Sequence, residues 1–319
     1  MPQFQWSSTG DEVVNAFPSS VHDKIILITG PSPGGVGAET ALSLARGNPK
    51  HLLLAGRSHE KIKPVIDEIN KINAAIKVTF IQLNLDSQAS VRRAAKDIQV
   101  ATDKIDILIN NAAIMACPYA KTEDGIESQF GTNHIGPFLL TNLLLPTIEA
   151  TGKGARIVNL TSTGAALGEI NFDDINFNDG KTYVPIAGYA QSKVASILFT
   201  VSLSKKFDNK EIASFSVHPG NISTGLQEHF KDPDVFKTMI DYVVFKAGGP
   251  LQREELKTLQ QGCATTLVAA LDPSILDSSG KYLRDGGIAE EQPKVEATDP
   301  VIAERLWALS EKLVGQHFD

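Results

Sequence analysis

A tyrosine and a lysine four positions apart, Tyr189 and Lys193, have the types and spacing needed for proton transfer. They open the segment Tyr189–Leu203, whose alanine, valine, isoleucine and leucine content predicts a helix, so both side chains project from one face. A free tyrosine titrates near pH ~10, and a neighbouring ammonium favours the phenolate. The pair therefore predicts a lowered tyrosine pKa and a tyrosine that serves as a general acid or base.

Ser162 is the candidate third member of this set. It directly follows the predicted strand Arg156–Leu160, at the edge of the sheet where parallel strands end, and a hydroxyl there could hydrogen-bond a substrate oxygen. Thr161 and Thr163 offer rival hydroxyls, and a serine that only caps a turn or helix is the alternative.

A glycine-rich turn follows the predicted strand Ile25–Thr29 over residues 30–37, and a helix is predicted directly after it, over Ala38–Arg46, with a left-handed cap at Gly47. Glycines let a backbone turn tightly and approach a pyrophosphate, while the amides at a helix start attract negative charge. The context predicts a dinucleotide site; a glycine-rich turn without a ligand is the alternative.

The end of the predicted strand Leu52–Ala55 indicates which dinucleotide would bind. An acidic residue there would hydrogen-bond an adenosine ribose and repel a 2′-phosphate. The chain instead carries Arg57 and Ser58, and an arginine fork beside a hydroxyl suits a phosphate monoester. NADPH is therefore predicted over NADH, and a solvated surface arginine is the alternative.

Short β-branched segments alternate with longer segments of helical period along the chain, which predicts a doubly wound α/β domain with a mainly parallel sheet covered on both faces. Six strands and a weaker seventh are predicted: Ile25–Thr29, Leu52–Ala55, Val78–Ile81, Ile107–Ile109, Arg156–Leu160, Ala213–Val217 and Lys281–Leu283. We expect a single domain over residues 1–319, with its core at about 24–285.

Two segments interrupt the alternation, at about residues 165–184 and 223–251, and both follow predicted strand ends. In open α/β sheets the ligand crevice lies there, so we expect them to shape a substrate pocket rather than form plain surface loops. Within the second, Phe236, Met239, Ile240 and Val243 have helical spacing and predict an apolar lid; a core or dimer-facing helix is the alternative. Met115 and Cys117 are further candidates for the pocket wall. The expected substrate is bulky and apolar.

Composition sets outer limits on function. The chain has 319 residues, 42% apolar and 21% charged, which fits a soluble globular protein and excludes disorder, collagen and coiled coil. A net charge of −7 without a basic patch argues against nucleic-acid and anionic-lipid partners. Two cysteines cannot form a disulfide framework, the histidines lack metal-site spacing, and the longest apolar run, Ala112–Cys117, is too short for a membrane span. We expect a cytoplasmic protein without a metal.

With these residues in place, the chain resembles the short-chain dehydrogenase/reductase family from about Lys24 to Asp285. The resemblance implies a Rossmann fold with sheet order 3-2-1-4-5-6-7 and a catalytic set of Asn133, Ser162, Tyr189 and Lys193. It also implies the following cofactor-binding residues: Gly30, Ser32, Gly35, Val36, Gly37, Arg57, Ser58, Asn84, Leu85, Asn111, Ala112, Tyr189, Lys193, Pro219, Gly220, Ile222 and Thr224.

Within the family, the segments Ala55–Arg57, Asn133–Phe138 and Tyr189–Lys193 are most similar to the retinol-dehydrogenase and WW-domain-oxidoreductase branch. That resemblance implies an NADP(H)-dependent oxidoreductase that interconverts carbonyl compounds and alcohols, and it is compatible with a homodimer. Tyr189 would give the proton and Ser162 would hold the oxygen, while Lys193 would contact the nicotinamide ribose and Asn133 would steady a helix kink.

The chain departs from the family pattern at a few positions. The glycine turn is one residue longer and contains Pro31 and Pro33, which leaves open which glycines contact pyrophosphate, and Asn84 replaces a common aspartate near the adenine. Two other functions stay open: a non-catalytic NADP(H)-sensing regulatory protein, and an NAD-retaining epimerase or dehydratase of the same superfamily.

Overall fold

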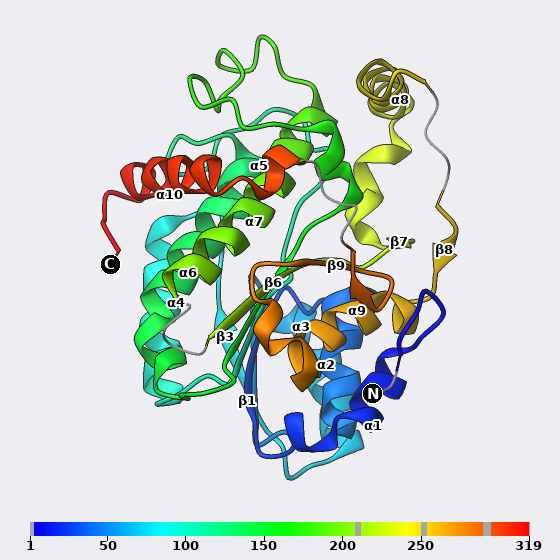
Figure 1. Ribbon diagram of the computed structural model, residues 1–319, viewed down its shortest axis with the longest axis vertical. Coiled ribbons are helices and arrows are strands. Elements are labelled where there is room, and N and C mark those ends of the chain that lie inside the picture. Colours follow the sequence, from blue (N-terminus) through cyan, green and yellow to red (C-terminus); the bar gives the residue numbers. More distant parts are fainter. Residues whose placement is uncertain (1–2, 208–211, 250–253, 290–294, 319) are drawn as a thin grey trace.

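A central sheet lies between two layers of helices in the computed structural model, which describes residues 3–207, 212–249, 254–289 and 295–318 (Figure 1). The strand order is β10-β9-β6-β5-β4-β1-β2-β3. Its strands are β1 (Ile25–Thr29), β2 (His51–Gly56), β3 (Lys77–Gln82), β4 (Ile107–Asn110), β5 (Arg156–Leu160), β6 (Ala213–His218), β9 (Tyr282–Arg284) and β10 (Gly287–Ile288). The doubly wound α/β prediction is confirmed.

All pairings in this sheet are parallel except that of β10, which runs antiparallel to β9. With β9 as the seventh strand, the expected order 3-2-1-4-5-6-7 is observed. The eighth strand escaped prediction because its two residues are too few to show any periodicity.

Alternate residues of each buried strand pack against opposite helix layers. On β1, Ile26 and Ile28 join the core under one layer, while Ile25 and Leu27 join the core under the other. The first layer contains α1 (Gly10–Ala16), α2 (Val36–Arg46), α3 (His59–Ile72) and α9 (Leu259–Leu271). The second contains α4 (Gln88–Ala101), α6 (Gly136–Glu149), α7 (Pro185–Lys206) and α10 (Pro300–Val314). Each fully buried aliphatic side chain contributes about 1.5–3 kcal/mol.

Helix α2 ends at Gly47 for a different reason than expected. The prediction of a left-handed cap there is wrong, because Gly47 has φ −87° and the left-handed residue is Asn48, with φ 57°. A Cβ on Gly47 would lie 2.6 Å from Cγ1 of the buried Val21, so contact with the N-terminal segment requires the glycine.

Both predicted insertions lie beyond the carboxyl ends of the strands (Figure 1). The first contains most of the 3₁₀ helix η3 (Thr163–Leu167) and a loop leading to α7. The second follows β7 (Asn221–Ile222) and contains η5 (Gly225–Lys231) and α8 (Pro233–Ala247), and β8 (Leu256–Lys257) comes after it. Pro250 and Leu251, which close the second predicted insertion, lie outside the described residues. The remaining elements are α5 (Ser128–Phe130), a π-helical turn (Gly131–Ile135) and short 3₁₀ helices at Pro18–Ser20, Pro273–Ser278 and Val295–Thr298. None of the helices in the described residues is long and apolar enough to cross a membrane.

Candidate active site

One large cavity, with a volume of about 1750 Å³, lies over the carboxyl ends of β1, β2, β4, β5 and β6. Apart from Asn133 and Ser58, every predicted site residue lines it. Parallel strands bring these positions together because their carboxyl ends share one edge of the sheet. The glycine turn and Arg57 lie on the same cavity as Ser162, Tyr189 and Lys193.

The glycine turn is joined tightly to the loop that follows β4. Asn111 Nδ2 donates to the carbonyl oxygens of Thr29 and Gly30, at 2.8 and 3.1 Å. In return, Thr29 Oγ1 accepts the backbone N–H groups of Asn111 and Ala112, each at 3.0 Å. A Cβ on Gly37 would lie 2.3 Å from Asn111 Nδ2, so this glycine is needed for the approach of the two loops.

The start of α2 offers an anion site. Its N-cap residue is Gly35, which supplies no side-chain acceptor for the first N–H groups of the helix. Those groups and the positive end of the helix dipole face the cavity at Val36 and Gly37. The arrangement fits a pyrophosphate, and Gly34, with φ +72° and open space around its Cβ position, forms the tip of the lengthened turn.

At the far end of the cavity, Arg57 and Ser58 have different surroundings. Arg57 lines the cavity, as do Asn84 and Asp86. Burial and the nearby Glu123 and Asp124 raise the pKa of Asp86, while Arg57 lowers it. Ser58 instead caps α3, because its Oγ accepts from Lys61 N at 3.3 Å and donates to Glu60 Oε2 at 2.7 Å. The hydroxyl expected beside Arg57 is therefore engaged by the helix.

Ser162 and Tyr189 both line the cavity; burial raises the tyrosine pKa, and interaction with the Ser162 hydroxyl lowers it in part. Ser162 Oγ also accepts the backbone N–H of Gly164 at 3.0 Å, which leaves its hydrogen for the phenol oxygen. The rival Thr161 is engaged elsewhere, since its Oγ1 donates to the carbonyl oxygen of Lys193 at 2.8 Å. Tertiary contacts therefore single out Ser162 over Thr161.

Lys193 is buried one helical turn after Tyr189, and its Nζ donates to the carbonyl oxygen of Leu160 at 2.9 Å. Burial lowers the pKa of Lys193 to about 7. Burial also raises the pKa of Tyr189 to about 12, against the lowering by Ser162. The prediction that the lysine lowers the tyrosine pKa is wrong for these protein groups: Lys193 Nζ lies 5.6 Å from the Tyr189 ring centroid and bonds the end of β5 instead.

Asn133 supports the site from behind the cavity wall. It lies in the π-helical turn Gly131–Ile135, where its Oδ1 accepts from Ile114 N and its Nδ2 donates to Ile114 O, both at 2.9 Å. Nδ2 also donates to Ser192 Oγ at 2.9 Å, and that hydroxyl donates to the carbonyl oxygen of Tyr189 at 2.7 Å. Asn133 thus joins the loop after β4 to the helix that carries Tyr189.

Helix α8 supplies an apolar part of the cavity wall, beside polar side chains of η5 such as Gln227, Glu228 and His229. Its residues Phe236, Met239, Ile240 and Val243 all line the cavity, as do Met115 and Cys117. Phe236 and Ile240 are 48% and 42% exposed, which argues against a core helix. Tyr242 Oη donates to the carbonyl oxygen of Leu167 at 3.3 Å and holds α8 over the first insertion.

Sequence reasoning assigned no side-chain role to three residues that hold the site together: Thr29, which it named only as the start of the glycine turn, Ser192 and His218. Each acts through partners that are distant in sequence or on the backbone, so residue spacing gave no signal for the first two. His218 had one available signal, because it ends β6 and directly precedes Pro219. Within the part of the chain that the structure describes, no group of three or more histidines, cysteines or carboxylates is arranged to hold a metal ion.

Comparisons with known proteins agree with one another. The family model described as short chain dehydrogenase matches residues 24–174. Human retinol dehydrogenase 13 is 38% identical over 301 residues, covering 93% of this chain and 86% of the relative. The short-chain dehydrogenase/reductase prx1 of Penicillium roqueforti is 34% identical over 308 residues, covering 93% and 86%.

Solved structures agree on the fold. A crystal structure of an uncharacterized protein from Mycobacterium paratuberculosis has a TM-score of 0.72 and 31% identity, covering 96% of this chain and 98% of that one. An RhlG/NADP active-site complex from Pseudomonas aeruginosa has a TM-score of 0.59 and 20% identity, covering 83% and 96%, and it supports the fold alone.

The burial of Lys193 predicts a pH-dependent stability. Its pKa of about 7 lies below the ordinary lysine value of 10.5, so between these values the unfolded chain binds more protons and stability rises with pH. The free energy of unfolding of the wild type minus that of Lys193→Met should rise over this window, at a slope approaching about 1.4 kcal/mol per pH unit. Denaturant titrations between about pH 7.5 and 9.5, which lie between the two pKa values, measure this difference.

The exposed Lys205 on the same helix provides the control. Lys205→Met should show no such slope. A flat difference for Lys193→Met would mean that the lysine titrates normally in the folded protein.

Proposed function

The chain belongs to the short-chain dehydrogenase/reductase family, and on that premise we propose that it is an NADPH-dependent carbonyl reductase for bulky, apolar ketones or aldehydes, or in reverse an alcohol dehydrogenase for the matching secondary alcohols. The main observation behind this proposal is that Ser162, Tyr189 and Lys193 line the same cavity as a glycine turn that directly precedes a helix. Family membership supports an oxidoreductase with a nicotinamide cofactor, and the residues above support the finer assignment.

The cavity residues fit an NADP(H) molecule. The N-terminus of α2 would receive the pyrophosphate, and Arg57 would receive a 2′-phosphate, since no carboxylate ends β2 to repel it. Pro219 and Gly220 would contact the nicotinamide end and Lys193 its ribose. When bound, a reduced nicotinamide supplies hydride to the carbonyl carbon.

Tyr189 is the group that would deliver the proton to the carbonyl oxygen. A pKa of about 12 keeps its phenol protonated at neutral pH, so the proton that the reduction consumes is present on this group. Ser162 would hydrogen-bond the same oxygen, because it lines the cavity together with Tyr189 and influences the tyrosine pKa. Asn133 and Ser192 would keep the backbone of Tyr189 fixed while the proton moves.

Exchange of Arg57 tests the choice of dinucleotide. Arg57→Asp should lower kcat/KM for NADPH by roughly 10- to 100-fold and reduce the preference for NADPH over NADH. The reason is that a charge-assisted bond between Arg57 and the 2′-phosphate is replaced by repulsion between a carboxylate and that phosphate. Steady-state kinetics with both cofactors measure the change. Arg93→Asp, the same charge change at an exposed position outside the cavity, should leave the preference intact. An unchanged NADPH preference in Arg57→Asp would exclude the assignment.

The apolar wall on α8 predicts the substrate class. In a panel of carbonyl compounds assayed by NADPH oxidation, bulky apolar ketones and aldehydes should react with higher kcat/KM than small hydrophilic ones. Phe236→Ser should reduce kcat/KM for the bulky substrates by about tenfold through lost apolar contact. Phe245→Ser, on the same helix but 79% exposed and not lining the cavity, should have no effect. Equal losses in both variants, or a preference for hydrophilic substrates, would count against an apolar pocket.

Removal of the Tyr189 hydroxyl tests the chemistry. Tyr189→Phe should lower kcat by roughly 10² to 10⁴ and leave the NADPH Kd nearly unchanged, because only the proton donor is lost. Tyr119→Phe, a matched change at a tyrosine outside the cavity lining, should retain activity. A fully active Tyr189→Phe enzyme would remove the tyrosine from the mechanism. A wild type that binds NADPH tightly but turns over no substrate would instead be a sensing protein.

A further inference from the structure

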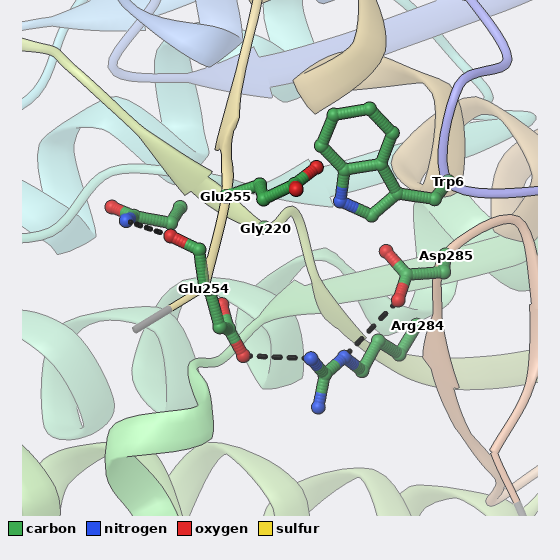
Figure 2. A pocket seen from close by; sticks show the side chains of 7 residues that line it. Trp6, Gly220, Glu254, Glu255, Arg284 and Asp285 are labelled. Carbon is green, nitrogen blue, oxygen red and sulfur yellow. Dashed lines mark hydrogen bonds and ion pairs between the residues drawn. The ribbon is translucent and has the colours of Figure 1, made fainter. Parts of the chain in front are cut away.

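A second, smaller cavity lies behind the Gly220 turn, with a volume of about 230 Å³ (Figure 2). Its lining includes Trp6 from the N-terminal segment, Glu254 from the segment before β8, and Arg284 and Asp285 from the end of β9. Gly220, Glu254 and Arg284 line the large cavity as well. The two cavities therefore share a wall that contains charged side chains.

An alternating series of charged groups runs through this wall. Lys257 Nζ contacts Asp285 Oδ1 at 2.6 Å, and Asp285 Oδ2 contacts Arg284 Nε at 3.3 Å. Arg284 Nη2 then contacts Glu254 Oε1 at 2.7 Å, as Figure 2 shows, and Glu254 Oε2 lies 3.2 Å from Nε2 of His218. Lys257 and His218 are nearly inaccessible, with side chains 1% and 5% exposed, so solvent screens these end members little.

The lysine end of the series supports the Gly220 turn. Gly220 has φ +102°, and a Cβ there would lie 2.6 Å from Cδ of Lys257, so the lysine stem packs directly against the turn. The Lys257 ammonium lies 5.5 Å from the centroid of the Trp6 ring, which covers it from the N-terminal side. The Gly220 turn is thus held against a buried cation.

The histidine end reaches the Ser162 turn. Nδ1 of His218 accepts the backbone N–H of Thr163 at 3.3 Å, and Thr163 is the residue next to Ser162. An accepting Nδ1 carries no proton, so the neutral ring holds its proton on Nε2, which faces the Glu254 carboxylate. Glu254 therefore stabilises the tautomer that can hold Thr163.

We propose that His218 is a positioning residue for the reduction: its Nδ1 holds the Ser162 turn, and the Glu254–Arg284–Asp285–Lys257 series fixes its tautomer and joins this turn to the Gly220 turn. This role of His218 rests on the proposed carbonyl reduction. With the N–H of Thr163 held by His218 and that of Gly164 by Ser162 Oγ, both amides that follow the serine are engaged, and the serine side chain is held on the cavity wall that it shares with Tyr189.

Two substitutions of His218 separate the acceptor from the donor. His218→Asn keeps an oxygen bonded to Cγ, where Nδ1 stands, and loses the link to Glu254. His218→Gln keeps an amide nitrogen near the Nε2 position and removes the acceptor from Thr163. Glu255→Gln, an exposed carboxylate of the small cavity outside the series, is the control. All variants are measured as the full chain with NADPH and the best substrate of the panel.

We expect His218→Gln to lower kcat by roughly 10- to 100-fold with an unchanged KM for NADPH, because a displaced turn misplaces the serine hydroxyl. Its pH profile for alcohol oxidation should shift to higher pH, since loss of the Ser162 hydrogen bond raises the pKa of Tyr189. His218→Asn and Glu255→Gln should stay close to the wild type in both readouts. Wild-type kinetics in His218→Gln, or an equal loss in His218→Asn, would overturn the inference.

Amide hydrogen exchange at Thr163, followed by NMR, keeps this test independent of turnover. Exchange should be slow in the wild type and in His218→Asn and faster in His218→Gln. A wild type without reductase activity but with a protected Thr163 amide would contradict the proposed function alone. If the wild type is active but the Thr163 amide exchanges equally fast in the wild type, His218→Asn and His218→Gln, only the positioning role would be contradicted.

Discussion

A reciprocal pair of hydrogen bonds between α7 and the end of β5 is the constraint on which the site depends. Lys193 Nζ donates to the Leu160 carbonyl oxygen, and Thr161 Oγ1 donates to the carbonyl oxygen of Lys193. Because both bonds are buried, breaking either would leave an unsatisfied polar group, which costs about 1–3 kcal/mol. They fix the helix against the strand, so that Tyr189, one turn before the lysine, meets Ser162, two residues after the strand.

The same burial sets the protonation of both groups, in opposite directions. A desolvated phenol keeps its proton and a desolvated ammonium gives its proton up more readily, which is why the pKa of Tyr189 rises to about 12 and that of Lys193 falls to about 7. The protein groups by themselves therefore produce a proton donor at neutral pH. Any further adjustment has to come from what binds in the cavity.

Backbone contacts between loops keep the rest of the site in place. Asn111 and Thr29 join the glycine turn to the loop after β4, Asn133 joins that loop to α7, and His218 joins the ends of β5 and β6. Each uses a polar side chain to satisfy a backbone group that a sheet edge or helix end leaves open. These contacts hold the cavity floor together, and α8 adds apolar residues to the wall.

The sequence by itself determined the alternation of strands and helices, the sheet order through its resemblance to a family, and many of the residues that line the large cavity, because periodicity and motif spacing are local properties. Only the tertiary structure decided how Ser58 is used, which way the pKa of Tyr189 moves and that His218 belongs to the site. These features depend on desolvation and on partners that are remote in the chain or lie on the backbone, and neither leaves a periodic trace in the order of residues.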